Sequence, residues 1–278
     1  MFQAAKPGLK LLAAGLIAGA STSVVLAQSS PKGLDLSSDN AGWISEGTEW
    51  VAVPGGAQPV TFDPQHPYVG NNQGKQPTFR VADLNNPNLT EFAKAELKKS
   101  NDMVLSGFAM YAREARCWHS GISYVLNPAQ PTYILQTPKK ITMLWQMDQQ
   151  VRHIYMDVPH SANPKPSWYG ESVGRYDGDA LVVDTIGLNG KSFLDNYRTP
   201  ASDKAHVVER YRLVDDGKML EARVLIEDPV SLKQPLELVH RWRKVNQSII
   251  ESRCADGEMS NPFEQRVEPL PTAARADF

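Results

Sequence analysis

Cysteine is scarce in this chain, with two among 278 residues, and several familiar sequence signals are missing. The chain has no glycine-rich phosphate loop and no dinucleotide-binding fingerprint, so nucleotide or nicotinamide chemistry is not expected. Histidines never recur at the His-x-His or His-x-x-x-His spacings that are common in metal sites. The sequence therefore predicts neither an organic cofactor nor a metal site.

An excess of positive charge is also lacking. The chain carries 29 basic and 31 acidic residues, a net charge of −2 at pH 7. Two of the basic residues, Lys6 and Lys10, lie in an N-terminal segment that we expect to be removed, so the mature chain is more acidic still. Proteins that bind nucleic acid usually present a basic surface, and we therefore expect no nucleic-acid partner. No segment beyond residue 27 has the roughly 20 apolar residues of a membrane span.

The first 27 residues have the layout of a secretory signal peptide. Two lysines precede a short apolar run, Leu11–Ala20, and Val25 and Ala27 form a small-residue cleavage site. A membrane anchor needs about 20 apolar residues in succession, and polar residues 21–23 interrupt this run. We predict a cleaved signal peptide over 1–27 and a periplasmic or secreted mature protein.

Export determines what we expect of Cys117 and Cys254. In an oxidising compartment an even number of cysteines suggests a disulfide. A bridge between these two would close a long loop and stabilise the fold by about 4 kcal/mol in the chain-entropy model. The alternative is two separate buried thiols.

The N-terminal part of the mature chain is weakly patterned. Residues 28–80 are rich in Gly, Pro, Asn and Gln, which predicts an extended arm or a partly disordered segment. Residues 88–100 form the one clear helical pattern, with Asn88 as a possible cap and Glu91 three positions later as in a capping box. We treat residues 81–278 as a single β-rich domain.

From about residue 130 the chain alternates apolar and polar residues as β-strands do. Asp-Gly pairs at 177–178 and 216–217 are typical of type I′ hairpin turns, and consecutive strands with tight turns pair in antiparallel fashion. We predict a mainly β fold, an antiparallel, lipocalin-like β-barrel or a barrel-like sandwich, with one N-terminal helix. The candidate strands are 131–137, 140–147, 150–157, 174–185, 207–214, 218–227, 236–244 and 247–254.

A Gly-x-Ser-x-Gly sequence surrounds Ser172. In α/β-hydrolases this sequence forms a nucleophile elbow between a buried strand and a helix. Here a proline-rich loop precedes it and a hairpin strand follows. We therefore interpret Gly170 and Gly174 as permitting a tight entry into a strand, and Ser172 as a hydrogen-bonding group of a binding site.

The strand that begins near Arg152 carries several candidate site residues. Alternation places Arg152 on one face and Tyr155 and Asp157 on the other. If the Tyr155 face lines a barrel interior, Asp157 needs a partner, because an unpaired buried carboxylate is costly. A purely structural ion pair is the alternative. The available partners are Arg152, Arg175, His160 and His206.

Asp184 and Glu209 stand alone among the apolar residues of later strands. Each can serve as a general acid or base only if its pocket raises its pKa; on the solvent side of an antiparallel sheet they would be unremarkable surface groups. Trp168 lies in a proline-rich loop, where it would cap a ligand pocket or plug the end of a barrel.

A longer pattern joins these residues: an Arg before an Ile-Tyr-x-Asp strand, a His, Trp-x-Gly-x-Ser-x-Gly, a Gly-Asp turn and Leu-Val-Val-Asp-Thr. It resembles a large family of exported, mostly uncharacterised bacterial proteins, and the likeness spans most of residues 80–256. The resemblance implies export and no particular activity. The chain departs from the family at Val158-Pro159, where Gly-Arg is usual, and at Ser161, where Pro is usual. The matching positions are Arg152, Ile154, Tyr155, Asp157, His160, Trp168, Gly170, Ser172, Gly174, Gly178, Asp179, Asp184 and Thr185.

Two functions of different classes fit these observations. One is a periplasmic, cofactor-independent lyase, isomerase or hydrolase that acts on a small, partly apolar molecule by acid–base chemistry. The other is a noncatalytic exported protein that holds a hydrophobic ligand in an apolar barrel interior. Convergence of the candidate residues around one cavity favours the enzyme. The candidate catalytic residues are His160 or His206 for proton transfer, Asp157 or Glu209 to orient the imidazole, and Arg152 to hold an anionic oxygen; Trp168, Ser172 and Tyr155 would contact the substrate.

Overall fold

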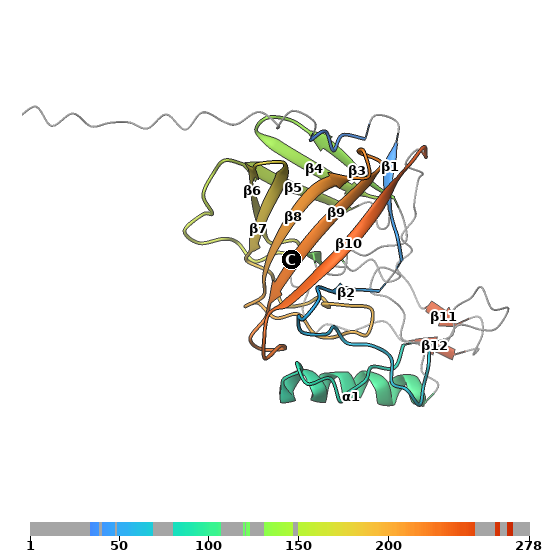
Figure 1. Cartoon of the computed structure of the whole chain (residues 1–278). Coiled ribbons are helices and arrows are strands. Elements are labelled where there is room, and N and C mark those ends of the chain that lie inside the picture. Colours follow the sequence, from blue (N-terminus) through green and yellow to red (C-terminus); the bar gives the residue numbers. More distant parts are fainter. Residues whose placement is uncertain are drawn as a thin grey trace, which may run out of the picture.

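The computed structural model describes most of the chain between residues 34 and 247 (Figure 1). The predicted signal peptide, Cys117, Cys254 and nearly all of the candidate strand 247–254 lie outside the described residues. No helix within the described part of the chain is long and apolar enough to cross a membrane. The described ranges are 34–38, 41–47, 49–68, 80–106, 119, 121–122, 131–146 and 150–247, with the backbone of 259–261 and 266–268.

Nine strands close into a barrel, which confirms the predicted fold class. Each strand pairs with the next along the chain from β3 to β10, and β1 closes the ring by pairing with both β3 and β10. A short strand, β2 (Val51–Ala52), adds to β10, and β11 (Met259–Asn261) pairs separately with β12 (Arg266–Glu268). The barrel strands are β1 (Gly42–Ser45), β3 (Thr132–Gln136), β4 (Lys140–Trp145), β5 (Gln150–Met156), β6 (Glu171–Asp177), β7 (Ala180–Ile186), β8 (His206–Val214), β9 (Met219–Glu227) and β10 (Leu236–Val245).

One pair of neighbouring strands is parallel, although the sequence predicts an antiparallel barrel throughout. Ile154 of β5 lies beside Ser172 of β6, and the register continues in the same direction to Met156 and Gly174. Parallel neighbours cannot be joined by a tight turn, so residues 157–170 must return along the barrel before β6 begins. We call residues 157–170 the crossover segment.

The two Asp-Gly pairs do mark hairpins, but not of the predicted turn type. Asp177 pairs with Ala180, so the loop consists of Gly178 and Asp179, and only Gly178 has a positive φ. A type I′ turn requires positive φ at both central residues. The β8–β9 loop is longer than two residues, because Val214 pairs with Met219.

The N-terminal region contributes to the fold in two ways. β1 comes from the predicted extended arm and completes the barrel. The helix α1 (Glu91–Leu105) begins later than expected, because Thr90 rather than Asn88 caps it by accepting a hydrogen bond from the backbone of Ala93. α1 lies below the barrel in Figure 1, and its buried face packs in a separate apolar cluster with Tyr197.

The interior of the barrel is filled by side chains. Inward-facing apolar residues of all its long strands form one continuous core, which includes four tryptophans. The cavity among Trp43, Trp145 and Trp242 has a volume of only about 10 Å³, which is room for roughly one water molecule. Where the structure describes it, the interior is therefore packed with side chains, as a barrel of about this strand number allows.

Candidate functional site

The inner side of the barrel wall holds a buried ion pair. Arg152 of β5 donates from Nη1 to Glu209 Oε1 of β8 at 2.8 Å and from Nη2 to the second carboxylate oxygen. It also donates to Ser172 Oγ at 3.0 Å and to Thr185 Oγ1 at 2.8 Å, while the Tyr211 hydroxyl donates to Glu209. All five side chains are buried. We call them the inner cluster.

Charge complementarity explains why these groups tolerate burial. Burial opposes the charge on Arg152, but the Glu209 carboxylate and its hydrogen bonds outweigh this effect, so the pKa of Arg152 lies above its ordinary value. Burial and the same carboxylate raise the pKa of Tyr211 well above its ordinary value. The polar groups of the inner cluster bond to one another within a packed interior. This arrangement favours a structural ion pair for Arg152 over the binding of an anionic substrate oxygen.

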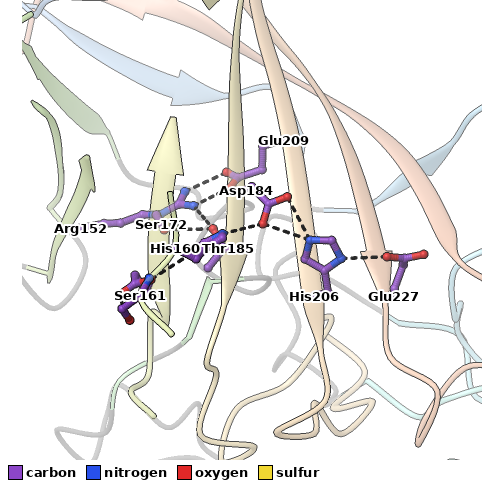
Figure 2. Close-up of polar contacts among 10 residues, drawn as sticks. Arg152, His160, Ser161, Ser172, Asp184, Thr185, His206, Glu209 and Glu227 are labelled. Carbon is purple, nitrogen blue, oxygen red and sulfur yellow. Dashed lines mark hydrogen bonds and ion pairs between the residues drawn. The ribbon is translucent and has the colours of Figure 1, made fainter. Parts of the chain in front are cut away.

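The outer side of the wall carries a second network, centred on Asp184 of β7 (Figure 2). His160 of the crossover segment directs Nε2 at Asp184 Oδ1, 2.8 Å away. His206 of β8 directs its own Nε2 at both oxygens of the same carboxylate, each 3.2 Å away. Asp184 therefore links two imidazoles, one from a strand and one from the crossover segment.

A further carboxylate completes each end of this network. Glu171 of β6 lies 3.1 Å from His160 Nδ1, and Glu227 of β9 lies 2.8 Å from His206 Nδ1. Glu171 also accepts hydrogen bonds from the backbone and the hydroxyl of Ser161, both at 2.7 Å. The order Glu171–His160–Asp184–His206–Glu227 thus alternates acids and imidazoles across four strands, and we call it the imidazole–carboxylate chain.

The surroundings of His206 favour its protonated form. Burial opposes the charge, but the hydrogen bonds to Glu227 and Asp184 outweigh it and raise the pKa of His206. Both ring nitrogens can donate only in the imidazolium form, which fits a ring placed between two carboxylates. At the other end, the hydrogen bonds from Ser161 lower the pKa of Glu171. The imidazole–carboxylate chain can therefore hold a proton on His206 at a partly exposed position.

A cavity of about 220 Å³ lies near the imidazole–carboxylate chain, although no member of that network is among its lining residues. It lies between the start of the crossover segment and the outer face of β6, and Val173, one of its lining residues, is the cross-strand partner of Asp184. Asp157 turns the chain at its edge with a left-handed φ of 56° and donates its backbone N–H to Gly174. We call this space the outer cavity; it is lined by Asp157, Val158, Val173, Gly174 and Arg175.

The structure divides the predicted site residues between the two sides of the wall. The Tyr155 side of β5 is the outer side: Tyr155 is 48% exposed and lies in register with Val173, while Arg152 points inward. Trp168 is half-buried, with its ring 5.7 Å from that of His119. The residues do not meet around one cavity. Arg152, Ser172 and Glu209 lie inside, and Tyr155, Asp157, His160 and His206 lie outside.

The two glycines beside Ser172 behave as the sequence predicts. Gly170 has a φ of +62°, and a Cβ there would lie 2.3 Å from the Ile186 carbonyl oxygen. A Cβ on Gly174 would lie 2.8 Å from side-chain atoms of Ile154 and Met156. Close backbone approach thus explains the glycines of the Gly-x-Ser-x-Gly sequence, and Ser172 is a buried member of the inner cluster.

Two members of the outer network, Glu171 and Glu227, were not singled out by the sequence. Glu171 shares the outward face of its strand with Val173 and Arg175 by simple alternation, so it could have been found once β6 was started at residue 171. Glu227 ends β9 directly opposite His206. That pairing becomes visible only when the hairpin register is known.

Among the described residues, no group of three or more His, Cys, Asp or Glu side chains is arranged to hold a metal ion. Comparisons of the chain with protein-family models, with curated proteins and with solved structures find no match.

Proposed function

We propose that the protein is an enzyme of the lyase or isomerase class that acts by acid–base chemistry on a small, partly apolar molecule at the outer face of the barrel. The observation that carries the proposal is that the imidazole–carboxylate chain lies one cross-strand pair, Asp184 beside Val173, from the outer cavity. Such chemistry requires proton donors and acceptors at partly exposed positions near a cavity that can hold a small ligand. The side chains supply both acid and base, so the reaction needs no organic cofactor.

His160 is the group best placed to meet a substrate. It belongs to the same segment as Asp157 and Val158, which line the outer cavity. Both of its nitrogens contact carboxylates, so the substrate has to replace one contact; rearrangement of this kind between free and bound forms is common. Asp184 would then orient the imidazole, and His206 would replenish the proton through Asp184.

A turnover screen tests this proposal. The protein is incubated with small acids, alcohols and esters that carry short apolar groups, and products are followed by NMR and mass spectrometry. Asp184→Asn should slow any conversion by about a hundredfold or more, because it removes the shared partner of both imidazoles. Glu237→Gln is the matched control. Glu237 lies in the same cross-strand row as Asp184, and its carboxylate forms an ion pair with Arg223. Equal turnover by the two variants would refute the assigned role of Asp184.

A noncatalytic ligand-binding protein is the second candidate, and one observation favours it. All four ring nitrogens of His160 and His206 already contact carboxylates, as in a purely structural network. Compounds that bind without being converted would support this reading. A hydrophobic ligand held among the core tryptophans is disfavoured, because small-molecule pockets have volumes of roughly 300 Å³ or more and the cavity there has a volume of about 10 Å³.

We also propose that the protein works outside the cytoplasm, as a periplasmic or secreted protein released by cleavage after Ala27. The support is the basic, apolar and small-residue order of residues 1–27 and the resemblance of residues 80–256 to exported bacterial proteins.

A further inference from the structure

Arg175 stands out among the arginines of the outer face. It begins a cross-strand row that continues through Val182 of β7 to Arg210 of β8 and Arg223 of β9. Arg210 donates to Asp177, and Arg223 donates to Glu237. Arg175 has no hydrogen-bond or ion-pair partner within the described chain, and it is the member of the row that lines the outer cavity. An unpaired guanidinium at a cavity is an available anchor for an anion, most of all for a planar carboxylate.

The other walls of the outer cavity are largely apolar. Val158 contributes an isopropyl group that is 47% exposed, and Val173 contributes a second one. Exposed valine beside a cation provides contact for a short hydrocarbon body attached to the anion. The volume of about 220 Å³ is below the usual range of drug-sized pockets, so the ligand must be small.

Asp157 limits the charge that the cavity accepts. Asp157 lines the same space as Arg175, and its negative charge disfavours a second negative charge on the ligand. A single carboxylate can pair with Arg175 and keep its apolar body against the valines. A dicarboxylate or a phosphate would be disfavoured.

We propose that the outer cavity binds a small monocarboxylic acid with a branched aliphatic or aromatic body, whose carboxylate pairs with Arg175. The inference rests on the proposed function, since it names the substrate class of the same site. It makes Arg175 a residue that determines specificity and does not transfer protons.

Ligand-observed NMR titrations of the full chain test this inference. The probes are isovalerate and benzoate, each compared with its neutral amide, isovaleramide or benzamide. We expect the acids to bind more tightly than the amides, and Arg175→Gln to weaken acid binding about fivefold, the size expected for one partly exposed charge pair. The matched control is Arg223→Gln, which removes the same charge from the same row, on β9, away from the cavity. Equal binding of acids and amides, or unchanged acid binding by Arg175→Gln, would overturn the inference.

A second variant tests whether Asp157 limits the charge of the ligand that the outer cavity binds. Asp157→Asn should improve the binding of succinate relative to isovalerate, because the repelling carboxylate is gone. Asparagine tolerates the left-handed backbone at this position, so the fold should survive. If succinate binds no better to this variant than to the wild type, Asp157 does not select monoanions and this part of the inference is wrong.

The two proposals can fail separately. Carboxylates that bind through Arg175 while no compound is converted would leave the binding inference standing and remove the enzymatic one. Conversion that depends on Asp184, with KM unaffected by Arg175→Gln, would support the enzymatic proposal and refute the role of Arg175 in binding.

Discussion

Asp184 and Thr185 are adjacent in β7, yet they serve networks on opposite sides of the barrel wall. Thr185 points inward and accepts a hydrogen bond from Arg152, whereas Asp184 points outward to His160 and His206. The period of two along a strand is enough to separate them. At the scale of single residues, the short sequence Asp-Thr therefore connects a structural network to a candidate functional one.

The inner cluster yields a prediction about stability. Glu209→Gln leaves the Arg152 guanidinium buried without its counter-charge, which should lower the free energy of unfolding by about 3–5 kcal/mol. Glu237→Gln breaks a largely exposed pair and should cost less than about 1 kcal/mol. Urea unfolding at pH 7 measures both. If Glu209→Gln costs no more than Glu237→Gln, the charge on Arg152 does not depend on Glu209.

At the scale of elements, the imidazole–carboxylate chain fastens the crossover segment to the barrel. His160 and Ser161 of that segment contact Asp184 and Glu171. The other members of the network lie on the four strands β6, β7, β8 and β9. Because β5 and β6 are parallel, the segment must return along the outer face, and the network holds it there beside the outer cavity.

The stability that the imidazole–carboxylate chain contributes should depend on pH. The folded-state pKa of His206 is raised above its ordinary 6.5, so its contribution to stability is complete below pH 6.5 and is lost as the pH rises through the raised pKa. The pKa of Glu171 is lowered from 4.5, so its contribution is present above pH 4.5 and is lost as the pH falls. The stability difference between wild type and His206→Gln should be largest at about pH 5–6 and should shrink towards pH 9. It should stay below about 1 kcal/mol, because the ring is partly exposed. A difference that is constant from pH 5 to pH 9 would contradict the assigned charge of His206.

At the scale of the whole molecule, local patterns predicted most strands and the hairpins between them. Alternation located β3, β4 and β5 to within about two residues, and the Asp-Gly pairs marked two hairpins. The parallel pairing of β5 with β6 and the closure by β1 were not predicted, because they join segments whose pairing leaves no local signal. The prediction of the site is limited for the same reason. The sequence selected His160 and His206, but only the folded structure shows that Asp184 contacts both.

The predictions about export and the disulfide belong to the whole chain and can be tested together. If the protein is exported, cleavage after Ala27 should give a mature protein that begins at Gln28, and mass spectrometry of the periplasmic or secreted fraction measures this end directly. An oxidised pair, Cys117 and Cys254, should lower the intact mass by two hydrogens, and reduction should restore it. Reduction should also destabilise the fold by about 4 kcal/mol, since the bridge closes a long loop in the unfolded chain. A full-length chain confined to the cytoplasm would refute export. A correctly processed chain whose mass does not change on reduction would instead leave export intact and show that the two cysteines are separate thiols.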